Sequence, residues 1–138
     1  MDNTISQRWH QRLESFEKAT HWLAEACEKT SLSTLEQAGL IKRFESAFEL
    51  AWKTLKDLLS TEGFDVTTPR NAFRTALTAG YLDAEATRTL LEALEKRNLL
   101  CHTYDEIAAN KAVELISSHF APTLRVLLVR LRARRDTP

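Results

Sequence analysis

A chain of 138 residues fits a single domain, because single domains most often run to about 100–150 residues. Its residues are 43% hydrophobic and 28% charged, which provides apolar side chains for a core and charge for a surface in water. The 19 basic and 19 acidic residues balance, which excludes a protein that attracts nucleic acid over its whole surface. Only three glycines and three prolines interrupt the chain, so few, long elements are expected and the composition favours an all-α fold.

Cys27 and Cys101 lie far apart and lack the spacing of metal ligands, so we expect two reduced thiols and no metal or cofactor. Neither a signal peptide nor a run of about eighteen apolar residues is present, which predicts a cytoplasmic protein without membrane contact. The histidines His10, His21 and His119 fall on expected helices without ligand-like companions, so surface or structural roles are the preferred interpretation.

The first half of the chain predicts two long helices. Residues 4–29 carry an apolar stripe at helical spacing that Thr20 interrupts. Residues 33–36 form a capping box, in which Ser33 and Glu36 satisfy free amide groups at a helix start. The second helix should run to about Glu62, and Gly63 suits a left-handed stop. The two stripes comprise Trp9, Leu13, Phe16, Leu23 and Cys27, then Ile41, Phe44, Phe48, Trp52, Leu55 and Leu59.

The next segments predict a short helix and a longer one. Thr68 suits the N-cap position and Pro69 the first turn of a short helix that ends near Gly80. Asp83 is placed to cap the following helix, which should run to His102. Leu90, Leu91 and Leu94 are the apolar residues that this helix should turn toward the core.

A helix boundary is expected beside His102. Residues 103–106, Thr-Tyr-Asp-Glu, form a second capping-box pattern, so one helix should end near His102 and the last helix begin at Thr103. Pro122 should kink or split that last helix, because proline removes an amide donor and crowds the preceding turn. The pattern predicts one domain over residues 1–138, an antiparallel four-helix bundle with a short extra connecting helix.

Three sets of side chains leave alternatives open. Phe44, Phe48 and Trp52 are preferred as core over a base-stacking platform, although three tryptophans exceed the needs of one small core and some could line a dimer interface. Glu49 and Lys53 have the spacing of a helix-stabilising ion pair, which is the preferred interpretation, although they could instead face the partner protein. The C-terminal arginines fit a solvated helix end or, less readily, a patch for RNA phosphate or an acidic partner: Arg125, Arg130, Arg132, Arg134 and Arg135.

The segment from Arg97 to Tyr104 holds the residue types of an acid–base site. A histidine exchanges protons near neutral pH, and an arginine offers a charged, planar fork for phosphate oxygens. Metal-free RNA cleavage through the 2′-hydroxyl requires both functions. On one ideal helix Arg97 and His102 would diverge by about 140°, which the expected helix break or a second subunit would relieve. From spacing alone, an ion-paired arginine and a structural histidine remain the preferred interpretation.

Residues 97–104 resemble the Arg-x4-His-x-Tyr signature of HEPN toxins, with the polar Asn98 directly after the arginine. Residues 44–57 resemble the second helix of the nucleotidyltransferase substrate-binding protein family, a branch of the HEPN proteins. The dipeptides Pro69-Arg70 and Gly80-Tyr81 and the segment 97–106 recur in the same order there, so the resemblance covers about residues 40–131.

The resemblance implies a small antiparallel bundle that forms a homodimer with both Arg–His sets near the subunit interface. It implies metal-independent endoribonuclease activity in active members and a cognate minimal nucleotidyltransferase, the antitoxin, that attaches AMP to the signature tyrosine. By position Arg97 and His102 would be catalytic, Asn98 would support them and Tyr104 would accept AMP. The added bulk and negative charge would block the site and repel RNA. A non-catalytic subunit that presents substrate to a nucleotidyltransferase is the alternative.

Overall fold

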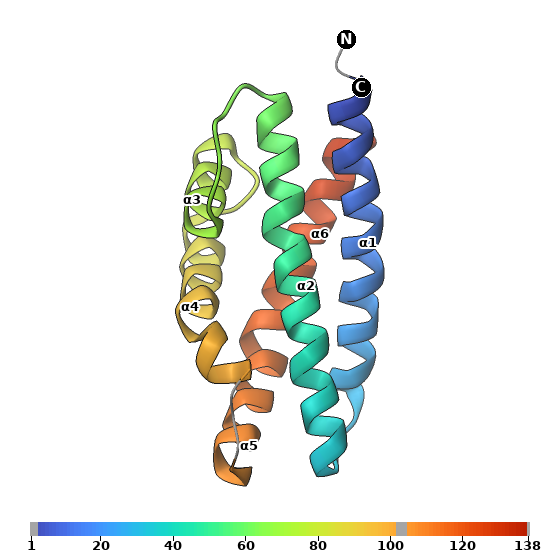
Figure 1. Ribbon diagram of the computed structural model, residues 1–138, viewed down its shortest axis with the longest axis vertical. Helices are drawn as coiled ribbons and strands as arrows, with labels where there is room; N and C mark the ends of the chain where they lie inside the picture. The colour runs from blue at the N-terminus through green and yellow to red at the C-terminus, as the bar shows by residue number, and fades with distance from the viewer. Residues whose placement is uncertain (1–2, 102–104, 138) are drawn as a thin grey trace.

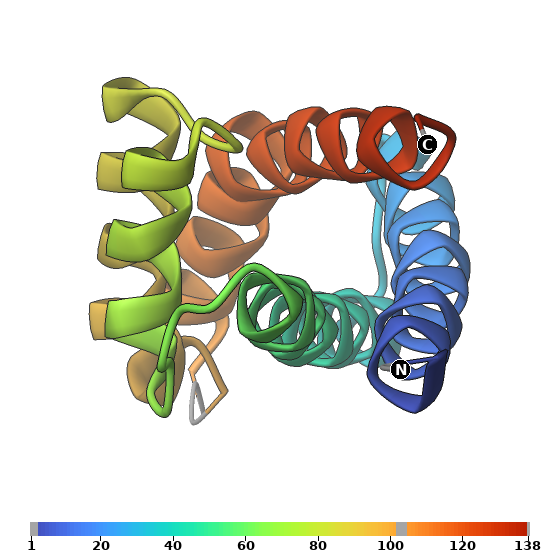
Figure 2. The same cartoon turned by 90° about the horizontal axis from the view of Figure 1, so that it is seen from above.

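The fold is that of a computed structural model, which describes residues 3–101 and 105–137. All regular elements in these residues are helices: α1 (Asn3–Glu28), α2 (Thr34–Thr61), α3 (Pro69–Ala79), α4 (Ala84–Cys101), α5 (Glu106–Leu115), the π-helix η1 (Ile116–Phe120) and α6 (Ala121–Arg135). The predicted all-α bundle is confirmed. Helices α1 and α2 lie side by side, α6 lies behind them, and α3 and α4 form the remaining side of the bundle (Figure 1, Figure 2).

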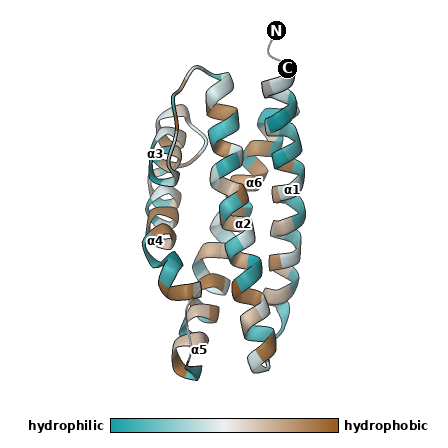
Figure 3. Ribbon diagram, in the orientation of Figure 1, coloured by the Kyte–Doolittle hydropathy of each residue, from teal (hydrophilic) through white to brown (hydrophobic). Residues whose placement is uncertain are grey.

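The core follows the apolar stripes that the sequence predicts. Leu13, Phe16 and Leu23 of α1 are fully buried. Thr20 is buried beside them, and its hydroxyl is satisfied there because it donates to the Phe16 carbonyl oxygen at 2.8 Å. On α2, Phe44 stacks on Phe120 with ring centroids 5.7 Å apart, which joins α2 to the C-terminal helices. Hydrophilic and hydrophobic residues alternate along the helices, as expected where each has one buried face (Figure 3).

The three tryptophans lie in three different environments. Trp9 is 4% exposed and belongs to the core, whereas Trp52 is only partly buried at the edge of the predicted α2 stripe. Trp22 is 54% exposed on the outside of α1. Phe44 and Phe48 are fully buried, so their interpretation as core is confirmed, and that of Trp52 is confirmed only in part. Trp22 is available for contact with another molecule.

Most predicted caps are present. The Ser33 hydroxyl accepts from the Glu36 amide at 3.1 Å and the Glu36 carboxylate accepts from the Ser33 amide at 2.9 Å, which completes the capping box. The Thr68 hydroxyl and the Asp83 carboxylate cap α3 and α4 by accepting from amides three residues on. After α3, Gly80 has a φ of 91°, a left-handed conformation that disfavours any residue with a Cβ.

The boundary near residue 102 is confirmed, but the predicted cap is wrong. Helix α5 begins at Glu106, and its N-cap is Asp105, whose carboxylate accepts from the Ala108 amide at 2.7 Å. The N-cap of α5 is therefore two residues later than the predicted cap at Thr103. An aspartate at the N-cap satisfies free amides of the first turn, as the predicted capping box would have done.

Pro122 distorts the last helix one turn earlier than its own position. Residues of η1 widen into a π-turn, in which the Ala121 amide donates to the Ile116 carbonyl oxygen five residues back. Proline has no amide to donate and its ring crowds the preceding turn, so the extra residue in that turn accommodates it. The chain continues as α6 without a break in the helix.

Residues 106–135 are long and apolar enough, by length and composition, to cross a membrane. In the bundle this stretch packs against α1, α2 and α4, and its apolar stripe is part of the core. The buried residues are Ala112, Ile116, Phe120, Leu124, Leu127, Leu128 and Leu131.

Candidate functional site

The Arg97 guanidinium, near the end of α4, binds the Glu49 carboxylate of α2 with an Nη1–Oε2 distance of 2.5 Å. The other oxygen of that carboxylate accepts from the Trp52 indole nitrogen at 3.2 Å. The guanidinium carbon lies 5.9 Å from the centre of the Phe48 ring, within the range of a cation–π contact. One carboxylate thus links the arginine and the indole, and we call these four residues the Arg97 cluster.

The helical register of α2 and α4 builds this cluster. Phe48 is fully buried, while Glu49 is the next residue and reaches the rim of the core with its side chain 34% exposed. Ala93 and Leu100 are buried on α4 and hold that helix against the bundle. Arg97 lies between them on the same side, about one helical turn from each, so its stem passes over the core edge and its side chain stays 31% exposed.

Glu49 binds Arg97, and the sequence-based assignment of Glu49 to a pair with Lys53 is wrong. The preferred partner lies 48 positions away in the chain, which no helical spacing reveals. The interpretation of Arg97 as an ion-paired arginine is confirmed. Its catalytic role is untested by this geometry and stays a prediction, since an arginine held by a carboxylate serves a structural role equally well.

Asn98 lies in a different environment from Arg97. Its side chain is exposed, and the next residue, Leu99, is 73% exposed. His102 and Tyr104, the predicted proton-transfer residue and AMP acceptor, lie outside the described residues. Among the predicted site residues that are described, Arg97 has partners at the core edge and Asn98 faces water.

Four of the five C-terminal arginines bind groups of this same chain. The partners are the Gly80 carbonyl oxygen for Arg130 at 2.9 Å, Glu17 for Arg132 at 3.3 Å, Glu62 for Arg134 at 3.3 Å and Asp136 for Arg135 at 2.9 Å. Three of them lie in the last turn of α6, where cations also complement the helix dipole. Along the chain, Asp136 is the sole acidic neighbour of these arginines, but the fold brings two further carboxylates to them. Because these carboxylates neutralise the arginines within the chain, the interpretation as a helix end is supported over that of a patch for RNA.

Tyr81, which follows the left-handed Gly80, joins this set. Its hydroxyl donates to the Glu62 carboxylate at 2.5 Å, and the same oxygen binds Arg134. Burial raises the pKa of Tyr81, and the bond to the Glu62 carboxylate adds to the rise. The bond to Tyr81 in turn raises the pKa of Arg134. The Gly80-Tyr81 dipeptide therefore fastens the α3–α4 connection to the ends of α2 and α6.

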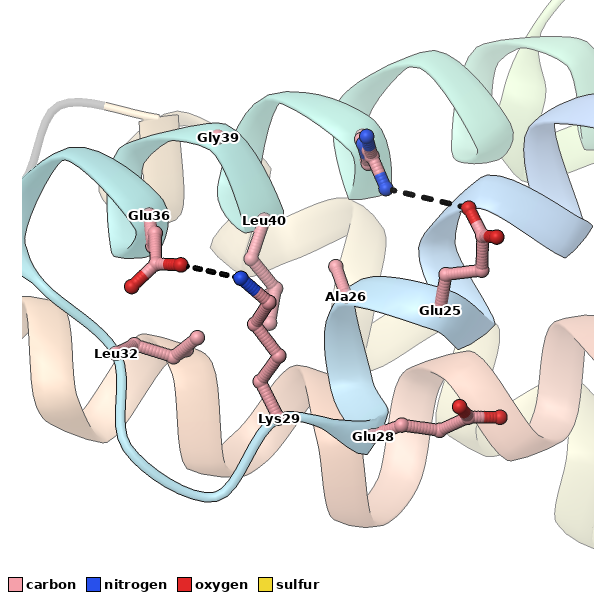
Figure 4. Close-up of a pocket in the computed structure, with 9 residues that line it drawn as sticks. Glu25, Ala26, Glu28, Lys29, Leu32, Glu36, Gly39 and Leu40 are labelled. Carbon is pink, nitrogen blue, oxygen red and sulfur yellow. Dashed lines mark hydrogen bonds and ion pairs between the residues drawn. The ribbon is translucent and has the colours of Figure 1, made fainter.

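A hollow of about 660 Å³ lies near the turn between α1 and α2 (Figure 4). Its charged side chains pair with each other: Lys29 with Glu36 at 2.5 Å, and Arg43 with Glu25 at 3.9 Å. The bond from Lys29, followed by that from the Ser33 amide, lowers the pKa of Glu36 from 4.5 to about 2. These pairs hold the turn, and none of the lining residues belongs to the Arg97 cluster.

The chemistry that the Arg97 cluster offers is that of binding. It supplies a charged fork and an indole at the surface, and both are groups that bind phosphate or a planar ring. Among residues 3–101 and 105–137, no three His, Cys, Asp or Glu side chains gather closely enough to hold a metal ion.

Residues 11–133 match the protein family described as nucleotidyltransferase substrate binding protein like. The chain belongs to this family. A protein of known crystal structure from Thermus thermophilus is 33% identical, covers 85% of this chain and 98% of its own, and superimposes with a TM-score of 0.78. No curated protein matches the sequence. The family that residues 44–57 and 97–106 indicated is confirmed, and its name associates the chain with a nucleotidyltransferase.

Proposed function

We propose that this protein is the binding subunit of a nucleotidyltransferase, a non-catalytic partner that docks on that enzyme and presents a substrate to it. The observation that carries the proposal is the match of residues 11–133 to the substrate-binding family. The resemblance to HEPN proteins adds two further proposals. The subunit forms a homodimer, and the enzyme attaches AMP to Tyr104.

The Arg97 cluster supports a binding role. The guanidinium charge is balanced by Glu49, and the indole of Trp52 holds the same carboxylate, so the subunit positions its arginine without any ligand. A preorganised arginine at a surface recognises a phosphate at a lower entropic cost than a mobile one. The segment that follows leads directly to Tyr104, which places the proposed modification seven residues from Arg97 in the sequence.

Co-expression with a nucleotidyltransferase encoded beside this chain tests the proposal. We expect the two proteins to purify as one complex and Tyr104 to gain the mass of AMP by mass spectrometry, with Tyr104→Phe unmodified but still bound. Separation of the two proteins during purification would refute the binding subunit. A complex in which Tyr104 stays unmodified would refute the modification alone.

A second candidate function is a metal-independent ribonuclease of the HEPN toxin type. The observation in its favour is Arg97 itself, which is 31% exposed and precedes His102 by five positions in a complete signature. In this mechanism Arg97 clamps the scissile phosphate, His102 transfers a proton to or from the 2′-hydroxyl, and Asn98 supports them. AMP on Tyr104 would then silence the nuclease.

Cleavage of cellular RNA in excess EDTA separates this candidate from the first. Wild-type protein with unmodified Tyr104 should cut RNA, and His102→Ala should not. If the folded wild type and His102→Ala leave RNA equally intact, the ribonuclease is refuted and the binding subunit stands alone.

A further inference from the structure

Two hollows on the outside of the bundle join into one groove along the seam between α1 and α2. One has a volume of about 310 Å³ and the other about 290 Å³. Ser15 and Leu50 line both, so the two hollows adjoin. On α1 the lining runs from Arg8 to Trp22, fourteen positions that span roughly 21 Å at 1.5 Å per residue. We call this surface the seam groove.

The seam groove is lined by cations and by no carboxylate. This is a local excess in a chain whose formal charge is zero. The five cations are Arg8, Arg12, Lys18, Lys42 and Arg43.

Carboxylates outside the lining neutralise these cations only in part. Arg12 binds Asp57 at 3.0 Å, whereas Lys42 and Arg43 stand at 3.7 Å and 3.9 Å from Glu45 and Glu25, distances at which exposed pairs contribute little. For Arg8 and Lys18, the described part of the chain supplies no ion pair. Along its length the groove therefore presents two cations without an ion pair among the described residues and two whose ion pairs are long.

Trp22 provides a flat apolar surface inside this line of charge. It is the tryptophan with the most exposed side chain among those described, at 54%, and it lines the groove together with Ala19 and Leu50. The Arg43 guanidinium donates to the Trp22 carbonyl oxygen at 2.7 Å, which fixes one cation beside the indole. A line of cations beside an exposed aromatic ring is a combination with which proteins hold single-stranded nucleic acid.

The groove also leads toward the Arg97 cluster. Ser46 lines the groove, and Glu49 lies three positions further on α2, so the two side chains are neighbours on one face of that helix. Glu49 in turn holds Arg97. A strand that follows the groove thus passes close to the site that the sequence singled out.

We propose that the seam groove binds single-stranded RNA, with the cations on its phosphates and a base stacked on Trp22. This inference goes beyond the proposed function and requires neither cleavage of the RNA nor modification of Tyr104. It also replaces the C-terminal arginines as the RNA contact, since four of those five are engaged with groups of this chain.

Fluorescence anisotropy with the purified full chain and a short, labelled 2′-O-methyl oligoribonucleotide tests the inference, because the blocked 2′-hydroxyl prevents cleavage. Trp22→Ala should weaken binding by about five- to one-hundred-fold, the loss of one stacked base, and Trp22→Phe should restore most of it. Lys18→Ala should reduce the slope of log K against log salt by about 0.7, the value for one phosphate contact on a single strand. Lys111→Ala, which replaces another exposed lysine, on α5, is the matched control and should bind as wild type.

Three results would overturn the inference. Unchanged binding by folded Trp22→Ala and Lys18→Ala would remove the groove, and weaker binding by Arg125→Ala would return the contact to the C-terminal arginines. Competition by poly-glutamate as strong as that by RNA would identify an acidic protein partner instead. Failure of the seam groove to bind RNA can be distinguished from failure of the proposed function. Complex formation with the nucleotidyltransferase and RNA cleavage are measured in separate assays that do not use this oligonucleotide.

Discussion

Glu49→Gln should destabilise the protein by about 1–2 kcal/mol, because it removes the charge that holds Arg97. Fully exposed ion pairs contribute about 0–1 kcal/mol, and breaking a buried pair costs about 3–5 kcal/mol. The Arg97 and Glu49 side chains are 31% and 34% exposed, so the expected cost lies between the value for an exposed pair and that for a buried pair, nearer to the exposed one. Glutamine has one acceptor oxygen where the carboxylate has two, so one of the two hydrogen bonds from Arg97 and Trp52 is lost, a cost of about 1 kcal/mol that gives the same order.

Urea unfolding of a double-mutant cycle measures the interaction itself. The free energies of Glu49→Gln, Arg97→Gln and the double variant should give a coupling energy of about 1 kcal/mol. Glu45→Gln is the matched control on the same helix: its pair with Lys42 is 3.7 Å long and its partner 73% exposed, so about 0.3 kcal/mol is expected. A further variant, Trp52→Phe, removes the indole bond to the carboxylate and keeps an aromatic ring; loss of that bond should cost about 0.5–1.5 kcal/mol.

A coupling energy no larger than that of the Glu45 pair would refute this reasoning. Arg97 would then be free to leave Glu49 in solution, and the preorganised guanidinium that supports the binding-subunit proposal would be lost. A coupling near 1 kcal/mol would instead establish Glu49 as the residue that positions Arg97, whatever function that arginine serves.

Three other measurements test separate parts of the structure. The bond from Lys29 lowers the pKa of Glu36 from 4.5 to about 2, so the stability that the Glu36 carboxylate contributes is complete above pH 4.5 and is lost as the pH falls to about 2. The difference in thermal midpoint between wild type and Glu36→Gln should therefore vanish across that pH window. A difference that stays constant would contradict the assignment. Phe120→Ala should cost about 3–5 kcal/mol in urea unfolding, since the ring is fully buried against α2, and a loss below about 1 kcal/mol would show that η1 does not close the core. If the protein is the expected homodimer, Leu99→Glu should weaken it in analytical ultracentrifugation, because this exposed leucine lies within the signature segment and the exposed Ile107 follows that segment; an unchanged dimer would place the interface elsewhere.

The amino-acid sequence alone determined the secondary structure because its signals are local. A capping box, a threonine before a proline and a left-handed glycine act within a few residues, and each is found where the sequence placed it. The apolar stripes of α1 and α2 likewise specify which faces are buried, since helical spacing is a property of the chain itself. The exception is the cap of α5, which the sequence placed at Thr103, a residue outside the described part of the chain, whereas Asp105 caps the helix.

Local sequence signals revealed only part of the candidate site. Arg97 and Asn98 were found because they stand in an ordered motif, but nothing in the motif indicates that Glu49 and Trp52 complete the environment of Arg97. The seam groove was missed for the same reason. Its cations come from two helices. In the sequence acidic residues lie among these cations, whereas in the fold no carboxylate lines the groove.

Tertiary structure alone decided the partners of the charged residues. Arg132 binds Glu17 and Arg134 binds Glu62, contacts that join the two ends of the chain and the end of α2. Charge pairs act over a few ångströms in space and are indifferent to separation along the chain, so they become predictable only once packing has brought the helices together. The sequence therefore determined which helices form and which faces they bury, and the packing of those helices decided which charges are neutralised and which remain free to bind.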